Sequence, residues 1–159
     1  MFVNASWTDN RPDFIVNMTF SDQGSIYSET TVVREIAFPI AKFLITQKEL
    51  GAKPLTLYNI SARLCDISAV FNKVPLIKQA YLAATKQSNL SFDCPLKPGF
   101  YTMRNLKISS RNPVWGIMNR PKVSYTIMGG MYEEVIGKSN ITLTTYAFTM
   151  KVIKKTCRD

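Results

Sequence analysis

Residues 88–101, SNLSFDCPLKPGFY, connect a predicted helix to a predicted strand and decide how the middle of the chain is held. The stretch contains a sugar-acceptor sequon at Asn89, Cys94 followed by proline, a Pro98–Gly99 pair and the aromatic pair Phe100–Tyr101. Proline followed by glycine predicts a turn, and the aromatic pair after it favours a strand. So many specialised residues in one connection are typical either of a catalytic loop or of a turn that ties two elements together.

The chain contains three cysteines, Cys65, Cys94 and Cys157, and no histidine. None of them forms a Cys-x-x-Cys pair, so neither a metal site nor a redox dithiol is expected. One disulfide and one further thiol is the simplest arrangement in an oxidising compartment. A bond from Cys65 to Cys94 would contribute about 3.5 kcal/mol by restricting the unfolded chain. Cys157 then requires an additional N-terminal cysteine or a second chain as its partner.

Between Cys65 and Cys94 the apolar residues recur at helical spacing. They are Leu76, Ile77, Ala80, Tyr81 and Ala84. Pro75 suits the first turn of a helix, because the N–H group that proline lacks would have no partner there. The pattern predicts one short helix over residues 74–87.

The rest of the chain reads mainly as strands. In residues 13–20, DFIVNMTF, the side chains of Phe14, Val16, Met18 and Phe20 fall on one side, which indicates a half-buried strand. Further segments are rich in β-branched and aromatic residues: IYSETTVVREIAF, IAKFLITQ, LTLYNISARL, FYTMRNLKI, VSYTIMGGMYEEV and ITLTTYAFTMKVIKK. Gly129–Gly130 in the fifth of these suggests a bend or bulge. About seven or eight strands and one helix predict a single all-β domain, residues 1–159, built as an antiparallel β-sandwich.

The absence of histidine removes the most common general base and the hydrolase triads that depend on it. Glu133 and Glu134 are adjacent, but neighbouring strand residues point to opposite faces. Asp66 and Asp93 flank the two central cysteines and more simply serve as surface or capping residues. No phosphate-binding glycine pattern is present. We therefore expect no enzyme, no catalytic residues, no metal and no cofactor.

The net charge of +9 does not predict nucleic-acid binding. The basic residues are scattered, apart from the C-terminal group Lys151, Lys154, Lys155 and Arg158, and no RNA-binding aromatic motif accompanies them. No apolar run approaches the ~18 residues of a membrane span. Neither a nucleic-acid partner nor an integral membrane segment is therefore expected.

Five of the ten asparagines begin an Asn-X-Ser/Thr sequon: Asn4, Asn17, Asn59, Asn89 and Asn140. This exceeds what the Ser and Thr content predicts by chance, so we expect a secreted, glycosylated protein. The first twenty residues carry Asp9, Arg11 and Asp13 where a signal peptide needs an apolar centre. An export signal is therefore not expected within these residues.

Large, adaptable apolar side chains are plentiful for a sandwich of this size, and methionine suits a cavity whose ligand varies in shape. The candidates for lining such a cavity are Phe43, Ile45, Ile60, Leu64, Phe71, Leu76, Tyr81, Phe100, Met103, Met128, Met131, Phe148 and Met150. The alternative is that these side chains fill a solid core.

The central segment, residues 57–108, resembles a known family. The resemblance rests on the order of Cys65, Asn72, Pro75-Leu76, Ser88-Asn89-Leu90, Cys94-Pro95-Leu96, Lys97, Gly99 and Tyr101. These residues are similar to a pattern in a large insect family of secreted proteins of unknown function, related to the lipid-recognition (ML) superfamily. The chain is also similar to chemosensory relatives of the ganglioside activator. The family's usual N-terminal cysteine is not in this sequence.

The resemblance implies an immunoglobulin-like β-sandwich whose two sheets splay apart to hold a lipid or another small hydrophobic ligand. We therefore expect a secreted, non-enzymatic binding protein for such a ligand, with a role in chemosensation. The alternative is an extracellular accessory or interaction module with a solid core that binds a receptor or channel in a membrane. A cavity between the sheets distinguishes the two, because only the first function requires one.

Overall fold

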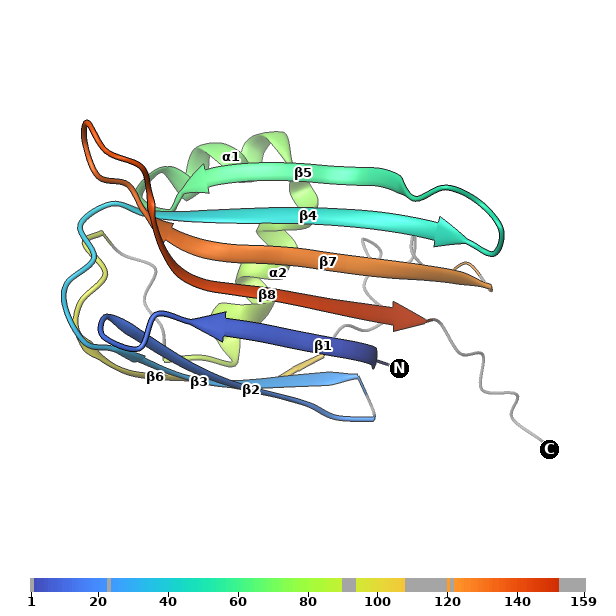
Figure 1. The fold of residues 1–159 in the computed structure, drawn as a ribbon, viewed down its shortest axis with the longest axis horizontal. Coiled ribbons are helices and arrows are strands. Elements are labelled where there is room, and N and C mark those ends of the chain that lie inside the picture. Colours follow the sequence, from blue (N-terminus) through green and yellow to red (C-terminus); the bar gives the residue numbers. More distant parts are fainter. Residues whose placement is uncertain (1, 23, 90–93, 108–119, 121, 152–159) are drawn as a thin grey trace.

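The computed structural model describes residues 2–22, 24–89, 94–107, 120 and 122–151, without the side chains of residues 71, 76, 77 and 80. Within them, eight strands and three helical segments follow one another (Figure 1). The strands are β1 (Phe2–Asp9), β2 (Phe14–Phe20), β3 (Ser25–Val32), β4 (Pro39–Glu49), β5 (Leu55–Arg63), β6 (Gly99–Lys107), β7 (Val123–Glu133) and β8 (Ile141–Lys151). The helical segments are the 3-10 turn η1 (Leu64–Asp66), α1 (Ile67–Lys73) and α2 (Pro75–Lys86).

Two antiparallel sheets face each other. The larger sheet has the strand order β1-β8-β7-β4-β5, and the smaller sheet has the order β2-β3-β6. The expected all-β antiparallel sandwich is therefore confirmed. The strand β1 was not predicted, because its sequence FVNASWTD lies at an edge and shows no clear alternation of apolar and polar residues.

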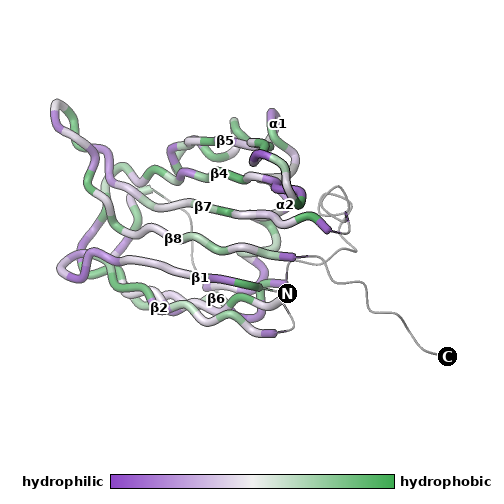
Figure 2. The backbone as a smooth tube through the Cα atoms, turned by 45° about the vertical axis from the view of Figure 1, so that its right-hand side comes forward, coloured by the Kyte–Doolittle hydropathy of each residue, from purple (hydrophilic) through white to green (hydrophobic). Residues whose placement is uncertain are grey.

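Alternation along each strand separates an inner face from an outer face. Phe14 and Val16 of β2 are buried, whereas the neighbouring residues Ile15 and Asn17 are exposed. Figure 2 shows hydrophobic and hydrophilic residues alternating along the strands, and a hydrophilic turn between β1 and β2. The half-buried strand predicted over residues 13–20 is confirmed as β2.

Along one side, the two sheets contact each other directly. There β1 of the larger sheet lies beside β2 of the smaller sheet, and the ring of Phe2 packs against that of Phe20 with centroids 5.1 Å apart. The turn that joins the strands is tight, since the carbonyl oxygen of Asn10 accepts the N–H of Phe14 at 2.7 Å. These contacts hold the β1–β2 side of the sandwich closed.

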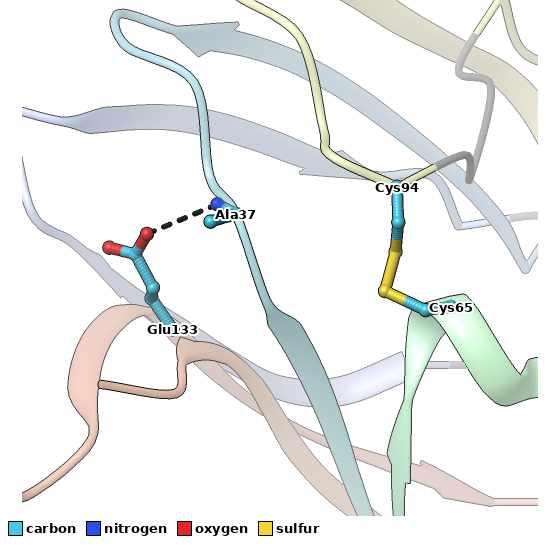
Figure 3. Close-up of a disulfide and its surroundings, with 4 residues drawn as sticks. All are labelled: Ala37, Cys65, Cys94 and Glu133. Carbon is cyan, nitrogen blue, oxygen red and sulfur yellow. Dashed lines mark hydrogen bonds between the residues drawn. A yellow bond between two sulfur atoms is a disulfide. The ribbon is translucent and has the colours of Figure 1, made fainter. Parts of the chain in front are cut away.

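On the opposite side, the helical segments lie between β5 and β6 (Figure 1). The predicted disulfide is confirmed: Cys65 of η1 is bonded to Cys94, with Cα atoms 5.3 Å apart (Figure 3). The helix predicted over residues 74–87 is confirmed as α2. The shorter helix α1 was not predicted, because its seven residues ISAVFNK are too few to show a clear helical period.

The residues after α2 are hydrogen-bonded to β6. The side chain of Asn89 accepts the N–H of Thr102 at 2.6 Å and donates to the carbonyl oxygen of Phe100 at 3.2 Å. The N–H of Arg104 donates to the carbonyl oxygen of Gln87 at 2.7 Å. Together with the disulfide, these bonds fix the helical segment to both sheets.

Buried apolar residues gather in two clusters rather than in one continuous core. One cluster contains Ile26, Ile45, Val123, Tyr125, Ile127 and Phe148. The other, toward the opposite ends of the strands, contains Phe14, Val16, Val32, Ile36, Leu96 and Leu143. The two ends of the sandwich are therefore each held by a core of their own.

An ionic cluster stabilises one of these ends. Arg34 lies 2.9 Å from a carboxylate oxygen of Asp13 and 2.6 Å from one of Glu133. The second oxygen of Glu133 accepts the N–H of Ala37 at 3.2 Å (Figure 3). The hydrogen bond from Arg34 holds the pKa of the Glu133 carboxyl below its ordinary value, although burial opposes this shift. Glu134 pairs instead with Arg63 at 2.8 Å, so the two adjacent carboxylates do not share a site.

Replacement of Glu133 by glutamine is expected to lower stability at neutral pH by about 1–3 kcal/mol, because it removes a charged hydrogen bond in a buried position. A lowered pKa stabilises the fold above the ordinary value of 4.5 and loses that contribution as the pH falls through the folded value. The melting temperatures of wild type and Glu133→Gln should therefore converge in acid. The half-exposed Glu134→Gln serves as control and should change little. Parallel pH profiles for wild type and Glu133→Gln would contradict this assignment.

Candidate functional site

A cavity of about 330 Å³ lies between the two sheets. Its walls come from the inner faces of β2, β3 and β6 on one side and of β4, β7 and β8 on the other. Tyr81 and Ala84 of α2 close the side where β5 and β6 are separated. The volume falls at the lower end of the ~300–1,000 Å³ that small-molecule sites occupy.

Seven of the thirteen cavity candidates line this space. They are Phe43, Ile45, Leu64, Tyr81, Met103, Met131 and Phe148. They converge because the inner faces of both sheets and the helical segment meet there. Phe71 and Leu76 lie outside the side chains that the structure describes.

The other four candidates, Ile60, Phe100, Met128 and Met150, do not line the cavity. Met128 pairs with Leu44 on the outer face of the larger sheet and is 38% exposed. Phe100 at the beginning of β6 is 58% exposed. Met128 directly follows the lining residue Ile127, and Phe100 directly precedes the lining residue Tyr101. Because one step along a strand reverses the face, neither Met128 nor Phe100 points into the cavity.

Several lining residues were not among the candidates. Those with large apolar or aromatic side chains are Phe14, Val16, Met18, Phe20, Ile26, Ile67, Leu96, Tyr101, Leu106, Ile127 and Tyr146. The alternation in residues 13–20 already places the first four on one face, so their signal is in the sequence. Tyr146 stands two residues before Phe148 and therefore shares its face.

The cavity offers little for chemistry. Among its described lining residues, Lys107 at the end of β6 is the only one with a charged side chain, and none carries a carboxylate or a thiol. Two of the hydroxyl groups are already bonded within the protein: Thr144 donates to the carbonyl oxygen of Thr8 at 2.7 Å, and Tyr101 donates to that of Lys97 at 2.8 Å. The arrangement suits binding of an apolar molecule rather than acid–base catalysis.

Two glycines of β7 allow close packing at the cavity wall. A β-carbon on Gly129 would lie 2.5 Å from the hydroxyl oxygen of Tyr146, and one on Gly130 would lie 2.6 Å from a backbone oxygen of β8. Pairing with β4 is unbroken across both glycines, and the register shift with β8 comes later, between Met131 and Tyr132. The predicted bulge at Gly129–Gly130 is therefore wrong, since these glycines provide space instead.

A second hollow of about 460 Å³ lies on the outer face of the larger sheet. Its lining includes Asn59 and Lys42, whose ammonium group lies 4.7 Å from the centre of the Tyr132 ring. Although its volume is larger, this hollow is more open to solvent than the cavity between the sheets, so it would desolvate an apolar molecule less completely.

The five sequon asparagines are all exposed. Asn4 and Asn59 lie on the outer face of the larger sheet, and Asn17 lies on that of the smaller sheet. The amide nitrogen of Asn89, to which a glycan would be attached, already donates a hydrogen bond to β6. Glycosylation stays a prediction at all five positions.

Among the residues that the structure describes, no group of three or more histidine, cysteine, aspartate or glutamate side chains could hold a metal ion. None of the described helices is long and apolar enough to cross a membrane. Asp66 is exposed. Asp93, Cys157 and the basic residues 154, 155 and 158 lie outside the described residues.

Replacement of Gly129 by alanine is expected to destabilise the protein by about 1–3 kcal/mol, because the new methyl group would collide with Tyr146 and the β4 backbone. Gly99→Ala is the matched control, since its β-carbon would meet nothing closer than 3.4 Å. Urea unfolding of both variants measures the difference. Equal urea midpoints for the two variants would show that Tyr146 and the β4 backbone do not pack closely against Gly129.

The chain was compared with known proteins. None of the curated proteins matches it. Among solved structures, the crystal structure of the C-terminal domain of wzt aligns with 94% of this chain and 75% of its own, at 10% sequence identity and a TM-score of 0.33. That likeness is too slight to support a statement about fold or function. The model of the family "Protein of unknown function (DUF1091)" matches residues 41–127, which is more than half of the chain. The matched range includes η1, α1 and α2. The chain therefore belongs to the DUF1091 family.

Proposed function

We propose that the protein is a secreted, non-enzymatic binding protein that holds a lipid or another small hydrophobic ligand between its two sheets. The observation that carries this proposal is the partly enclosed cavity of about 330 Å³ with predominantly apolar walls. Burial of apolar ligand surface there would supply affinity at ~25 cal/mol per Å². The small volume favours one slender chain or a compact ring system over a lipid with two long chains.

The cavity also favours one of the two expected functions over the other. An accessory module that binds a receptor through its surface has no need of a void, and empty apolar space costs stability because the atoms lining it lose contacts. Two separate core clusters with a cavity between them therefore favour the ligand-binding function.

Other features support secretion, a relationship to the lipid-recognition superfamily and binding without catalysis. The Cys65–Cys94 disulfide and five exposed sequon asparagines suit the secretory route. A sandwich opened by a helix along one side agrees with a relationship to the lipid-recognition superfamily. A role in chemosensation rests on the resemblance of the central segment alone. The cavity lining, without a described carboxylate or thiol, supports binding without catalysis.

The test uses displacement of the neutral fluorescent probe N-phenyl-1-naphthylamine by a panel of unlabelled lipids. Ala84 of α2 lines the cavity, and the Ala84→Phe substitution should fill part of it and weaken probe binding by about tenfold or more. Leu82→Phe introduces the same residue on the same helix, at a side chain that is 42% exposed and outside the cavity.

Wild type and Leu82→Phe should bind the probe alike, and both should release it to at least one lipid of the panel. A wild-type protein that binds no probe and no lipid would refute the proposed function. Equal binding by Ala84→Phe and wild type would place the ligand elsewhere on the protein.

A further inference from the structure

We propose that Tyr146 donates a hydrogen bond to an uncharged oxygen of the ligand, so that the cavity selects apolar molecules carrying a carbonyl or ether oxygen within their body. This inference rests on the proposed function and names the class of ligand that the same cavity takes.

The position of Tyr146 places its hydroxyl on the cavity side of the larger sheet. Tyr146 pairs with Gly129 in the β7–β8 register, and Gly129 stands between Ile127 and Met131, which both line the cavity. The hydroxyl oxygen lies 2.5 Å from the position that a β-carbon on Gly129 would occupy, on the face of the larger sheet where Ile127 and Met131 line the cavity.

The ring of Tyr146 is held by its neighbours. It stacks on Phe148 at 6.1 Å between centroids with an interplanar angle of 22°, and it lies 6.4 Å from the ring of Phe43. Because these contacts and the backbone at Gly129 fix the ring, the hydroxyl is presented in one direction. A donor that is held in advance costs little entropy when a ligand binds.

The Tyr146 hydroxyl makes no hydrogen bond with any residue that the structure describes. Tyr101, which also lines the cavity, differs because its hydroxyl donates to the carbonyl oxygen of Lys97 at 2.8 Å. Because the Tyr146 hydroxyl has no described protein partner to give up, a ligand oxygen that accepts its proton gains affinity from the hydrogen bond.

The chemistry of the wall restricts that oxygen to an uncharged one. Burial raises the pKa of Tyr146, so the phenol stays a neutral donor at physiological pH. The only charged side chain among the described lining residues, Lys107, stands at the end of β6 and is exposed. A carboxylate within the cavity would therefore be left without a counter-charge, whereas a ketone, ester or ether oxygen needs only the hydrogen bond.

Two hydroxyl groups on the opposite wall of the cavity, in the smaller sheet, offer further polar contacts to a ligand. Ser28 and Thr30 of β3 both line the cavity, and neither side chain is hydrogen-bonded to a described residue. They belong to the middle strand of the smaller sheet, which faces the larger one. An oxygen-bearing ligand therefore meets polar groups from both sheets, while the rest of its surface meets apolar side chains.

The experiment compares a straight-chain ketone, carrying its carbonyl in mid-chain, with the alkane of the same length. Each displaces the neutral fluorescent probe N-phenyl-1-naphthylamine from the full chain. Wild type should bind the ketone about five- to tenfold more tightly than Tyr146→Phe does, whereas both proteins should bind the alkane alike. Tyr101→Phe is the matched control, because it removes a hydroxyl whose partner is a protein carbonyl, and it should bind the ketone as wild type does.

Thermal unfolding of the ligand-free variants gives an independent measure. Tyr146→Phe should melt at or above the wild-type temperature, since it removes a hydroxyl without a partner; a clear decrease would reveal a protein partner and overturn the inference. Equal affinity of wild type and Tyr146→Phe for the ketone would also overturn it while leaving the proposed function intact. A protein that binds neither the probe nor the two compounds would refute the proposed function and the inference together.

Discussion

The helical segment that separates β5 from β6 is the constraint on which the rest of the structure depends. Two facing sheets ordinarily pack about 10 Å apart and fill the space between them with their own side chains. Here one side closes through β1 and β2, while α1 and α2 occupy the other side. The Cys65–Cys94 bond and the hydrogen bonds of Asn89 keep the helices in that position. The sheets therefore cannot close along their full width.

A sandwich held open in this way needs other sources of stability. The two buried clusters and the ionic group around Arg34 supply them toward the ends of the strands, and several residues of both clusters also line the cavity. The middle remains incompletely packed, and its lining atoms lose contacts that a bound molecule would restore. Stability and ligand binding are thus linked, because a molecule that binds only the folded state shifts unfolding in favour of that state.

Much of the fold was predictable because local patterns carry it. The alternation in β2 and the proline that begins α2 each act over a few residues. The Cys65–Cys94 bond joins residues 29 positions apart, but with only three cysteines in the chain few pairings were possible. The strand β1 was not predictable, since its sequence FVNASWTD shows no clear alternation of apolar and polar residues. The glycines of β7 were misread because a pattern cannot tell a bulge from a close approach of Tyr146.

The cavity was only partly predictable, for a related reason. Candidates chosen by size and character include Phe100 and Met128, which point outward, because composition does not fix the face of a strand. Tyr146 was absent from the candidates although it shares a face with Phe148. Its significance depends on which sheet lies opposite and on which hydroxyl groups already have partners. Both facts belong to the three-dimensional arrangement and not to any short stretch of sequence.

The most direct measurement is native mass spectrometry of the protein secreted by a eukaryotic host and purified without detergent or organic solvent. If the helical segment holds open a ligand cavity, part of the wild-type protein should carry one apolar molecule, and this adduct should be lost or much reduced in Ala84→Phe. Unmodified mass for the wild type, together with no uptake from an added lipid panel, would contradict the presence of a functional cavity between the sheets.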